Sequence, residues 1–152
     1  MRKITLLLTV MLPVIILSQP MEGDKSISIS GNGVLWPDSL KMVDVGITSG
    51  YFFRDNIEVN IGLGYQYTVS SNSVTLCPGV NYGFIPSDQL LFMVGVSIPY
   101  DFNNKMWSTD FNVHLIYFLS EMAGLKFTNT FEITPSTDEK TDKVFFGAIL
   151  YY

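Results

Sequence analysis

The chain has 152 residues, of which 47% are hydrophobic, 14% aromatic and only 15% charged, and its net charge at pH 7 is −5. The acidic balance argues against a nucleic-acid partner, because surfaces that bind phosphate backbones carry an excess of Lys and Arg. The low share of charged residues argues against an ordinary secreted soluble domain, whose surface carries more charge.

Residues 1–18 have the layout of a secretory signal peptide. Two basic residues precede an apolar run at 4–17, and Ser18 and Gln19 follow it with small and polar side chains. A transmembrane helix is the alternative, but it needs about 20 apolar residues and this run is shorter. We expect cleavage after Ser18, which leaves 19–152 as one domain and changes the net charge from −5 to −7 by removing the two basic residues.

Cys77 is the only cysteine of the chain. A single cysteine excludes an intrachain disulfide, so the protein is not a small secreted domain held together by disulfides. Its distance from the signal segment also argues against a lipid anchor. We expect a small, buried, nearly apolar side chain at this position.

From residue 25 onward, apolar side chains recur at every second position, which is typical of β-strands with two unlike faces. In 57–69, for example, isoleucine, valine, leucine and tyrosine alternate with glutamate, asparagine, glycine, glutamine and threonine. Within a later strand, Asn129 is the one polar side chain on the apolar face. The alternation predicts eight strands, at 25–33, 43–53, 57–69, 73–84, 90–100, 110–119, 123–133 and 143–152.

The glycines indicate which face points outward. Most strand glycines lie on the polar face, where exposure to water would weaken the strands without a gain. The lumen of an eight-stranded barrel is only just wide enough for side chains, so glycines fit there and eight bulky faces do not. The predicted fold is therefore an all-β, eight-stranded, antiparallel, up-and-down transmembrane barrel with its apolar face toward lipid. A soluble barrel with the apolar face inward is the alternative.

The last strand is expected to pair with the first, because an open edge in lipid leaves backbone groups unpaired. Strands of about ten residues, tilted by about 40°, cover about 25 Å of hydrocarbon. Aromatic girdles are expected at the two interfaces. Their residues are Tyr51, Phe53, Phe84, Tyr117 and Tyr152 on one side and Tyr67, Tyr100 and Phe111 on the other.

The segment 19–152 resembles the small eight-stranded outer-membrane β-barrels of Gram-negative bacteria, of the OmpA-barrel and OmpX kind. Two stretches carry the resemblance: GYFFRDNIEVNIGLGY at 50–65, with a short turn between two strands, and FGAILYY at 146–152. The resemblance implies a porin-like fold in the outer membrane, export through the inner membrane by the signal peptide, the lipid bilayer as partner, and a monomeric state.

The C-terminal residues imply an assembly signal. Members of this family end in an aromatic residue, with apolar residues at alternate positions and a glycine upstream, and Phe146, Gly147, Leu150 and Tyr152 occupy these positions. The ending is similar to the signal that the outer-membrane assembly machinery binds, which makes that machinery an implied partner. The chain departs from the pattern by ending in tyrosine instead of the commoner phenylalanine, and by leucine where an aromatic residue is frequent.

The connections divide between the two ends of the predicted barrel, since both chain ends of such a barrel lie in the periplasm. Turns are expected at 54–56, 85–89 and 120–122 on the periplasmic side, and loops at 37–41, 70–72, 103–109 and 136–142 on the outer side. The outer loops are short, so they offer little area to a large partner.

The polar face places four carboxylates, one lysine and the only histidine in the lumen. These residues are Asp44, Glu58, Asp110, His114, Lys126 and Glu132. Buried charges need partners, so we expect Lys126 to pair with Glu58 or Glu132 and to plug the barrel. We also expect side chains to fill the lumen, which argues against an open aqueous pore.

No enzymatic activity, metal or cofactor is expected. His114, with Ser97 and the carboxylates on the same face, is the one candidate for catalysis, which would require mutual contact and an oxyanion pocket. Barrels that modify lipids expose their catalytic groups to lipid or to the outer surface, whereas His114 points into the lumen. One histidine and one distant cysteine make no metal site.

Two functions are open at this point. The first is a non-enzymatic integral outer-membrane barrel with a structural, adhesive or membrane-integrity role. The alternative is a secreted soluble barrel of the lipocalin kind that binds a small apolar ligand, which requires the apolar face to line a cavity.

Overall fold

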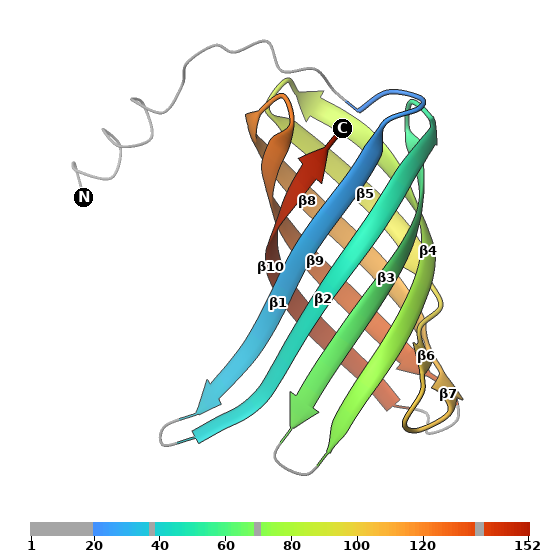
Figure 1. Ribbon diagram of the computed structural model, residues 1–152, viewed down its shortest axis with the longest axis vertical. Coiled ribbons are helices and arrows are strands. Elements are labelled where there is room, and N and C mark those ends of the chain that lie inside the picture. Colours follow the sequence, from blue (N-terminus) through green and yellow to red (C-terminus); the bar gives the residue numbers. More distant parts are fainter. Residues whose placement is uncertain (1–19, 37–38, 69–70, 136–138) are drawn as a thin grey trace, which may run out of the picture.

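The computed structural model describes residues 20–36, 39–68, 71–135 and 139–152. The predicted signal peptide at 1–18 lies outside this range. The described strands form one antiparallel sheet (Figure 1), and no helix among the described residues is long and apolar enough to cross a membrane.

Ten strand segments follow one another along the chain. They are β1 (Lys25–Trp36), β2 (Ser39–Arg54), β3 (Ile57–Thr68), β4 (Asn72–Ser87), β5 (Leu90–Ser97), β6 (Tyr100–Asp101), β7 (Met106–Trp107), β8 (Thr109–Ser120), β9 (Ala123–Thr134) and β10 (Glu139–Tyr151). Only Ile98 and Pro99 separate β5 from β6, and only Ser108 separates β7 from β8. Pro99 has no backbone N–H to donate to a neighbouring strand, which explains why the strand is interrupted between β5 and β6. The short β6–β7 hairpin therefore extends two of eight barrel strands.

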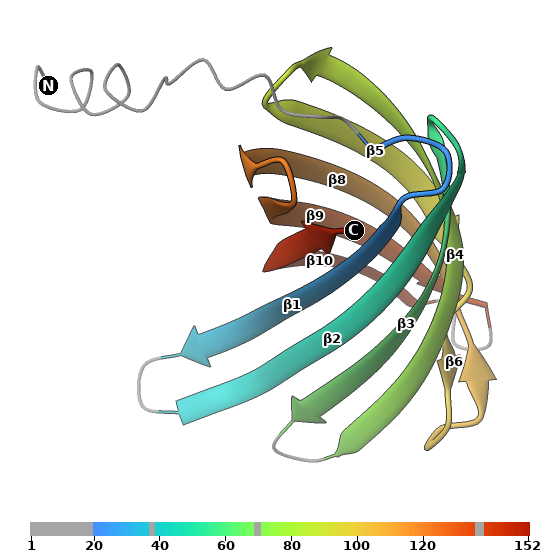
Figure 2. The same cartoon turned by 45° about the horizontal axis from the view of Figure 1, so that its top comes forward.

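The sheet closes on itself, as the sequence predicts. Its order is β3-β2-β1-β10-β9-β8-β5-β4, and β4 pairs back with β3, so the described strands encircle one axis (Figure 2). The closing pair of β1 and β10 runs antiparallel, with Ser26 opposite Tyr151 and Gly31 opposite Phe146. Lys25 and Tyr152 exchange two backbone hydrogen bonds, of 2.9 Å and 3.0 Å, at the end of this pair. The register of this pair covers Ser26–Gly31 of β1 and Phe146–Tyr151 of β10, so the ring is closed along the part of the two strands nearest the C-terminus.

The two ends of the barrel differ. Tight turns at 55–56, 88–89 and 121–122 lie at the end that carries the C-terminus, and the β6–β7 hairpin lies at the opposite end (Figure 1). We call these the turn end and the hairpin end.

The predicted connections are shorter or more ordered than expected. β4 continues to Ser87, so the expected turn at 85–89 shrinks to two residues, and β2 and β10 begin at Ser39 and Glu139, inside the expected loops 37–41 and 136–142. The expected loop 103–109 contains β7 and belongs to the hairpin. The strands extend past the alternating pattern because pairing satisfies backbone groups whatever the side chains are. Residues 37–38, 69–70 and 136–138 lie outside the described range.

The outer surface of the barrel is a belt of large apolar side chains. Exposed members on the strands include Ile29, Val45, Ile47, Ile61, Leu63, Tyr65, Val80, Tyr82, Val94, Val96, Phe111, Leu115, Leu125, Phe127, Phe146 and Leu150. Leu63, for instance, is 60% exposed, whereas its two neighbours along β3, Gly62 and Gly64, face the lumen. The apolar face therefore points away from the lumen, as predicted.

Candidate functional site: the barrel lumen

The half of the lumen near the turn end is filled by an apolar cluster. Its residues are Phe52, Leu91, Met93, Ile116, Phe118, Ile149 and Tyr151, each at most 5% exposed. The Tyr151 ring lies between Phe52 and Phe118, with centroid distances of 6.1 Å and 5.5 Å. Since the alternation predicted a small or polar inner face, this cluster is an exception. Its sequence signal is two large apolar residues in a row at strand ends, as in Leu90-Leu91 and Tyr117-Phe118.

Glu58 lies beside this cluster and is 4% exposed. Ser26 Oγ donates a 2.6 Å hydrogen bond to Glu58 Oε1, and Asn81 Nδ2 donates a 2.7 Å bond to Oε2. Gly50 leaves the space for this carboxylate, because a Cβ there would overlap Glu58 Oε1. Two neutral donors, from β1 and β4, therefore solvate the buried carboxylate.

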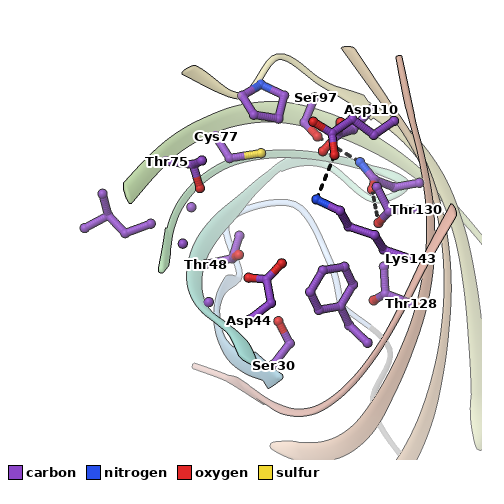
Figure 3. A pocket seen from close by; sticks show the side chains of 18 of the residues that line it. Ser30, Asp44, Thr48, Thr75, Cys77, Ser97, Asp110, Thr128, Thr130 and Lys143 are labelled. Atoms are coloured by element: carbon purple, nitrogen blue, oxygen red, sulfur yellow. Dashed lines mark hydrogen bonds and ion pairs between the residues drawn. The ribbon is translucent and has the colours of Figure 1, made fainter. Parts of the chain in front are cut away.

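Beyond the apolar cluster, toward the hairpin end, the lumen holds a cavity of about 220 Å³ that is lined mainly by polar residues and glycines. Along β8 the inner face changes from Phe118 and Ile116 in the cluster to His114, Asn112 and Asp110 at the cavity. Asp44, Cys77 and Lys143 point into the same space from three different strands (Figure 3). Side chains therefore fill the half of the lumen near the turn end, and the other half contains a cavity.

The charges at the hairpin end differ from the predicted pairing. Glu132 binds Lys143, with 2.7 Å between Oε2 and Nζ, and Asp110 lies opposite Glu132 in the sheet register. The described residues give Lys126 no ion pair with either Glu58 or Glu132, so the predicted direct pairing is wrong. The prediction missed Lys143, the second lumenal lysine. Alternate residues of β10 point to opposite faces, and Phe146 points outward, so Lys143 points inward. This alternation is the sequence signal for the second lumenal lysine.

The remaining lumenal polar groups form short hydrogen-bonded chains. His114 Nδ1 and Thr128 Oγ1 are 2.8 Å apart, and both side chains are buried. Thr130 Oγ1 donates to Asn112 Oδ1 at 2.8 Å, and Asn112 Nδ2 donates to Ser97 Oγ at 2.9 Å. Ser97 thus contacts Asn112 and not His114. Over the described ranges, no three His, Cys, Asp or Glu side chains are grouped so as to hold a metal ion.

The outer face of the C-terminal strand carries the residues of the predicted assembly signal. Phe146, Leu150 and Tyr152 are 66%, 52% and 62% exposed and point away from the lumen. Gly147 points inward, where a Cβ would overlap the backbone of β1 at Ile29 and Ser30.

The fold is shared with known membrane barrels. No protein-family model and no curated protein matches the chain. The N-terminal β-barrel domain of OprF from Pseudomonas aeruginosa is 14% identical, with a TM-score of 0.70 over 88% of this chain and 100% of that one. The outer-membrane protein Ail of Yersinia pestis is 11% identical, with a TM-score of 0.63 over 86% of this chain and 100% of that one.

The chain has the fold of the small outer-membrane β-barrels. A de novo designed transmembrane β-barrel is similar too, with 16% identity and a TM-score of 0.68 over 90% of this chain and 100% of the design. The designed sequence thus has the same fold as this chain, at a sequence identity as low as that of the natural barrels. The reason is that the fold requires mainly alternating apolar and polar residues, turns and lumenal glycines. The similarity concerns the fold alone.

Proposed function

We propose that the protein is a non-enzymatic integral β-barrel of the outer membrane with a structural, adhesive or membrane-integrity role. The observation that supports this most directly is the belt of half-exposed apolar side chains around a closed ring of strands. A surface of this kind and extent is unfavourable in water and favourable in lipid. Seven of the eight barrel strands have 12 to 16 residues, which exceeds the length needed to cross about 25 Å of hydrocarbon at a tilt of about 40°, and the eighth, β5, has 8 residues and is extended by β6.

The proposal includes export and assembly. The segment 1–18 would direct the chain through the inner membrane and be removed. The outward aromatic and apolar residues of β10 would then be available to the outer-membrane assembly machinery, with the turn end in the periplasm and the hairpin end outside.

The lipocalin-like alternative requires the apolar face to line a cavity. The cavity here is lined mainly by residues of the polar set, and most of the large aliphatic side chains lie on the outer surface. This arrangement favours the membrane barrel over a soluble carrier of apolar ligands.

The test is cell fractionation combined with electrophoresis of unboiled samples. We expect the protein to sediment with outer membranes and to change its migration on boiling, because a closed barrel stays folded in detergent until heated. A freely soluble periplasmic protein whose migration does not change on boiling would contradict the proposal.

A further inference from the structure

The cavity carries opposite charges toward its two ends. Lys126 lines it near the start of β9, and Glu132 lines it near the end of the same strand, with Asp110 opposite. Glu132 follows Lys126 by six positions, which corresponds to about 20 Å along the strand. The ammonium group thus lies toward the apolar cluster, and the carboxylates lie toward the hairpin end.

The Lys126 ammonium lacks a bonded polar partner in the described part of the chain. Among the described residues it makes neither a hydrogen bond nor an ion pair, and Glu58, whose charge acts on it from farther away, already accepts bonds from Ser26 and Asn81. A cation inside a barrel that lacks a direct partner is available to an anionic group that enters the cavity.

The part of the cavity near the hairpin end carries an excess of negative charge. Lys143 is engaged by Glu132, and the structure shows no ion pair for Asp44 or Asp110 within the described part of the chain. The four side chains act on one another electrostatically, with three negative charges against one positive when all are ionised. Such a zone attracts cationic groups and repels anions. Because the described acidic groups are not arranged for a metal ion, an organic ammonium group fits better.

The apolar cluster closes the cavity toward the turn end, so a solute enters and leaves past the rim near Asp101 and Ser108. A simple anion would have to pass the negative zone first. A simple cation would leave Lys126 without a partner.

We propose that the cavity binds a short zwitterionic solute of the peptide class, with its carboxylate at Lys126 and its ammonium group at Asp44 and Asp110. An extended tripeptide spans about 10 Å, and the long lysine side chain covers part of the remaining distance. The hydroxyl and amide side chains of the walls provide hydrogen bonds for the peptide groups. The site requires a folded barrel but no particular role of the protein in the membrane.

Calorimetric titration of the folded barrel in detergent, at neutral pH and low salt, tests the proposal with three matched probes. They are triglycine, N-acetyl-triglycine without the ammonium group, and triglycine amide without the carboxylate. We expect triglycine to bind at least about tenfold more tightly than either blocked form, since each loses one charge pair. Equal affinity for all three, or no heat of binding for triglycine at millimolar concentration, would overturn it.

Variants assign the two ends of the ligand. Lys126→Met should abolish the preference for triglycine over its amide, and Asp44→Asn should weaken the preference over the acetylated form. Asp142→Asn is the control, because it makes the same charge change at an exposed β10 residue outside the cavity. A Lys126→Met barrel that still migrates as a folded species and keeps the full preference would contradict the placement of the carboxylate.

Cys77 provides a second measurement on the unmodified protein, because it lines the same cavity and is the only cysteine. Triglycine should slow its alkylation by iodoacetamide, and triglycine amide should do so less. An alkylation rate that saturating triglycine leaves unchanged would exclude binding beside Cys77. Fractionation tests the proposed membrane role separately, so either proposal can fail alone.

Discussion

Gly147 lies where the last strand meets the first, and its missing side chain permits the close contact of β10 with β1. A Cβ at this position would overlap the carbonyl oxygen of Ile29 and approach the Cα of Ser30. Both of these atoms belong to the backbone, so no side-chain rotation can relieve the overlap.

We expect Gly147→Ala to lower the free energy of unfolding in urea by about 1–3 kcal/mol, because the two closing strands must move apart. Gly46→Ala is the control, since a Cβ there would meet its nearest atoms only at 3.6 Å and 3.7 Å, an ordinary contact distance. Equal stability of the two variants would show that the closing pair tolerates the shift.

The two lumenal lysines should differ in their effect on stability. Lys143→Met removes the direct partner of Glu132 and leaves carboxylates facing one another, which we expect to cost about 1–3 kcal/mol. Lys126→Met breaks no direct contact and should cost less, with urea unfolding of both variants as the measurement. A larger loss for Lys126→Met would restore the pairing that the sequence suggested.

At the scale of elements, the β6–β7 hairpin is attached to the barrel rim by pairing of β6 with β4, and the Asp101 carboxylate adds side-chain hydrogen bonds there. Asp101 accepts hydrogen bonds from Ser73 Oγ at 2.8 Å and from the backbone N–H groups of Asn103 and Asn104 at 2.8 Å and 3.0 Å. Tyr100 packs against Phe102 and Trp107 on the same hairpin, with the Trp107 ring 4.6 Å away. The hairpin lies at the rim beyond the proposed membrane-spanning segments.

The hairpin should loosen in acid. Partial burial raises the pKa of Asp101, but the hydrogen bonds from Asn104, Ser73 and Asn103 lower it by more, so the net pKa lies below the usual 3.8. The stabilisation is therefore complete above the unfolded-state pKa and is lost as the pH falls through the lower folded-state value.

The fluorescence of Trp107 in a Trp36→Phe background reports this transition, because Trp36 is the only other tryptophan. We expect its emission to change below about pH 4. Asp101→Asn should shift the spectrum at neutral pH and remove the acid transition. A spectrum that stays constant into that acidic range would contradict the role of Asp101.

The apolar cluster at the turn end acts as the core of this barrel, although it lies inside the lumen. Ile116 is fully buried there, and its neighbour Leu115 is 41% exposed on the outside. We expect Ile116→Ala to cost about 2–5 kcal/mol, because it adds a cavity to the lost transfer free energy. Leu115→Ala leaves no cavity and should cost less, as urea unfolding in detergent or lipid would show. Equal losses would mean that the cluster is loosely packed.

For the whole molecule, the structure combines a hollow half with a sealed half. Among the described residues, the apolar cluster closes the cavity toward the turn end. We expect no stable conductance steps from the purified protein in planar bilayers, because ions would have to cross an apolar constriction. Steady unitary currents would contradict the closure of the lumen by the apolar cluster. Leu115→Ala changes only the lipid-facing surface, so it is the control variant and should also give no stable conductance steps.

The sequence by itself determined the strands, their two faces, the outward direction of the apolar side chains and the closure of the ring. Alternation has a period of two, and a closed eight-stranded ring leaves no room for bulky residues from all strands inside, so these properties follow from local pattern and volume. Parity along each strand also placed Asp44, Glu58, Asp110, His114, Lys126 and Glu132 inward.

Only the tertiary structure decided which of these inward groups meet. Register between strands sets the depth of each side chain, and it brought Lys143 to Glu132 and left Lys126 without an ion pair among the described residues. It also gathered the apolar exceptions of four strands at the turn end and left a cavity at the other. Such groupings join residues far apart in the chain, and a pattern within one strand carries no information about depth relative to the others.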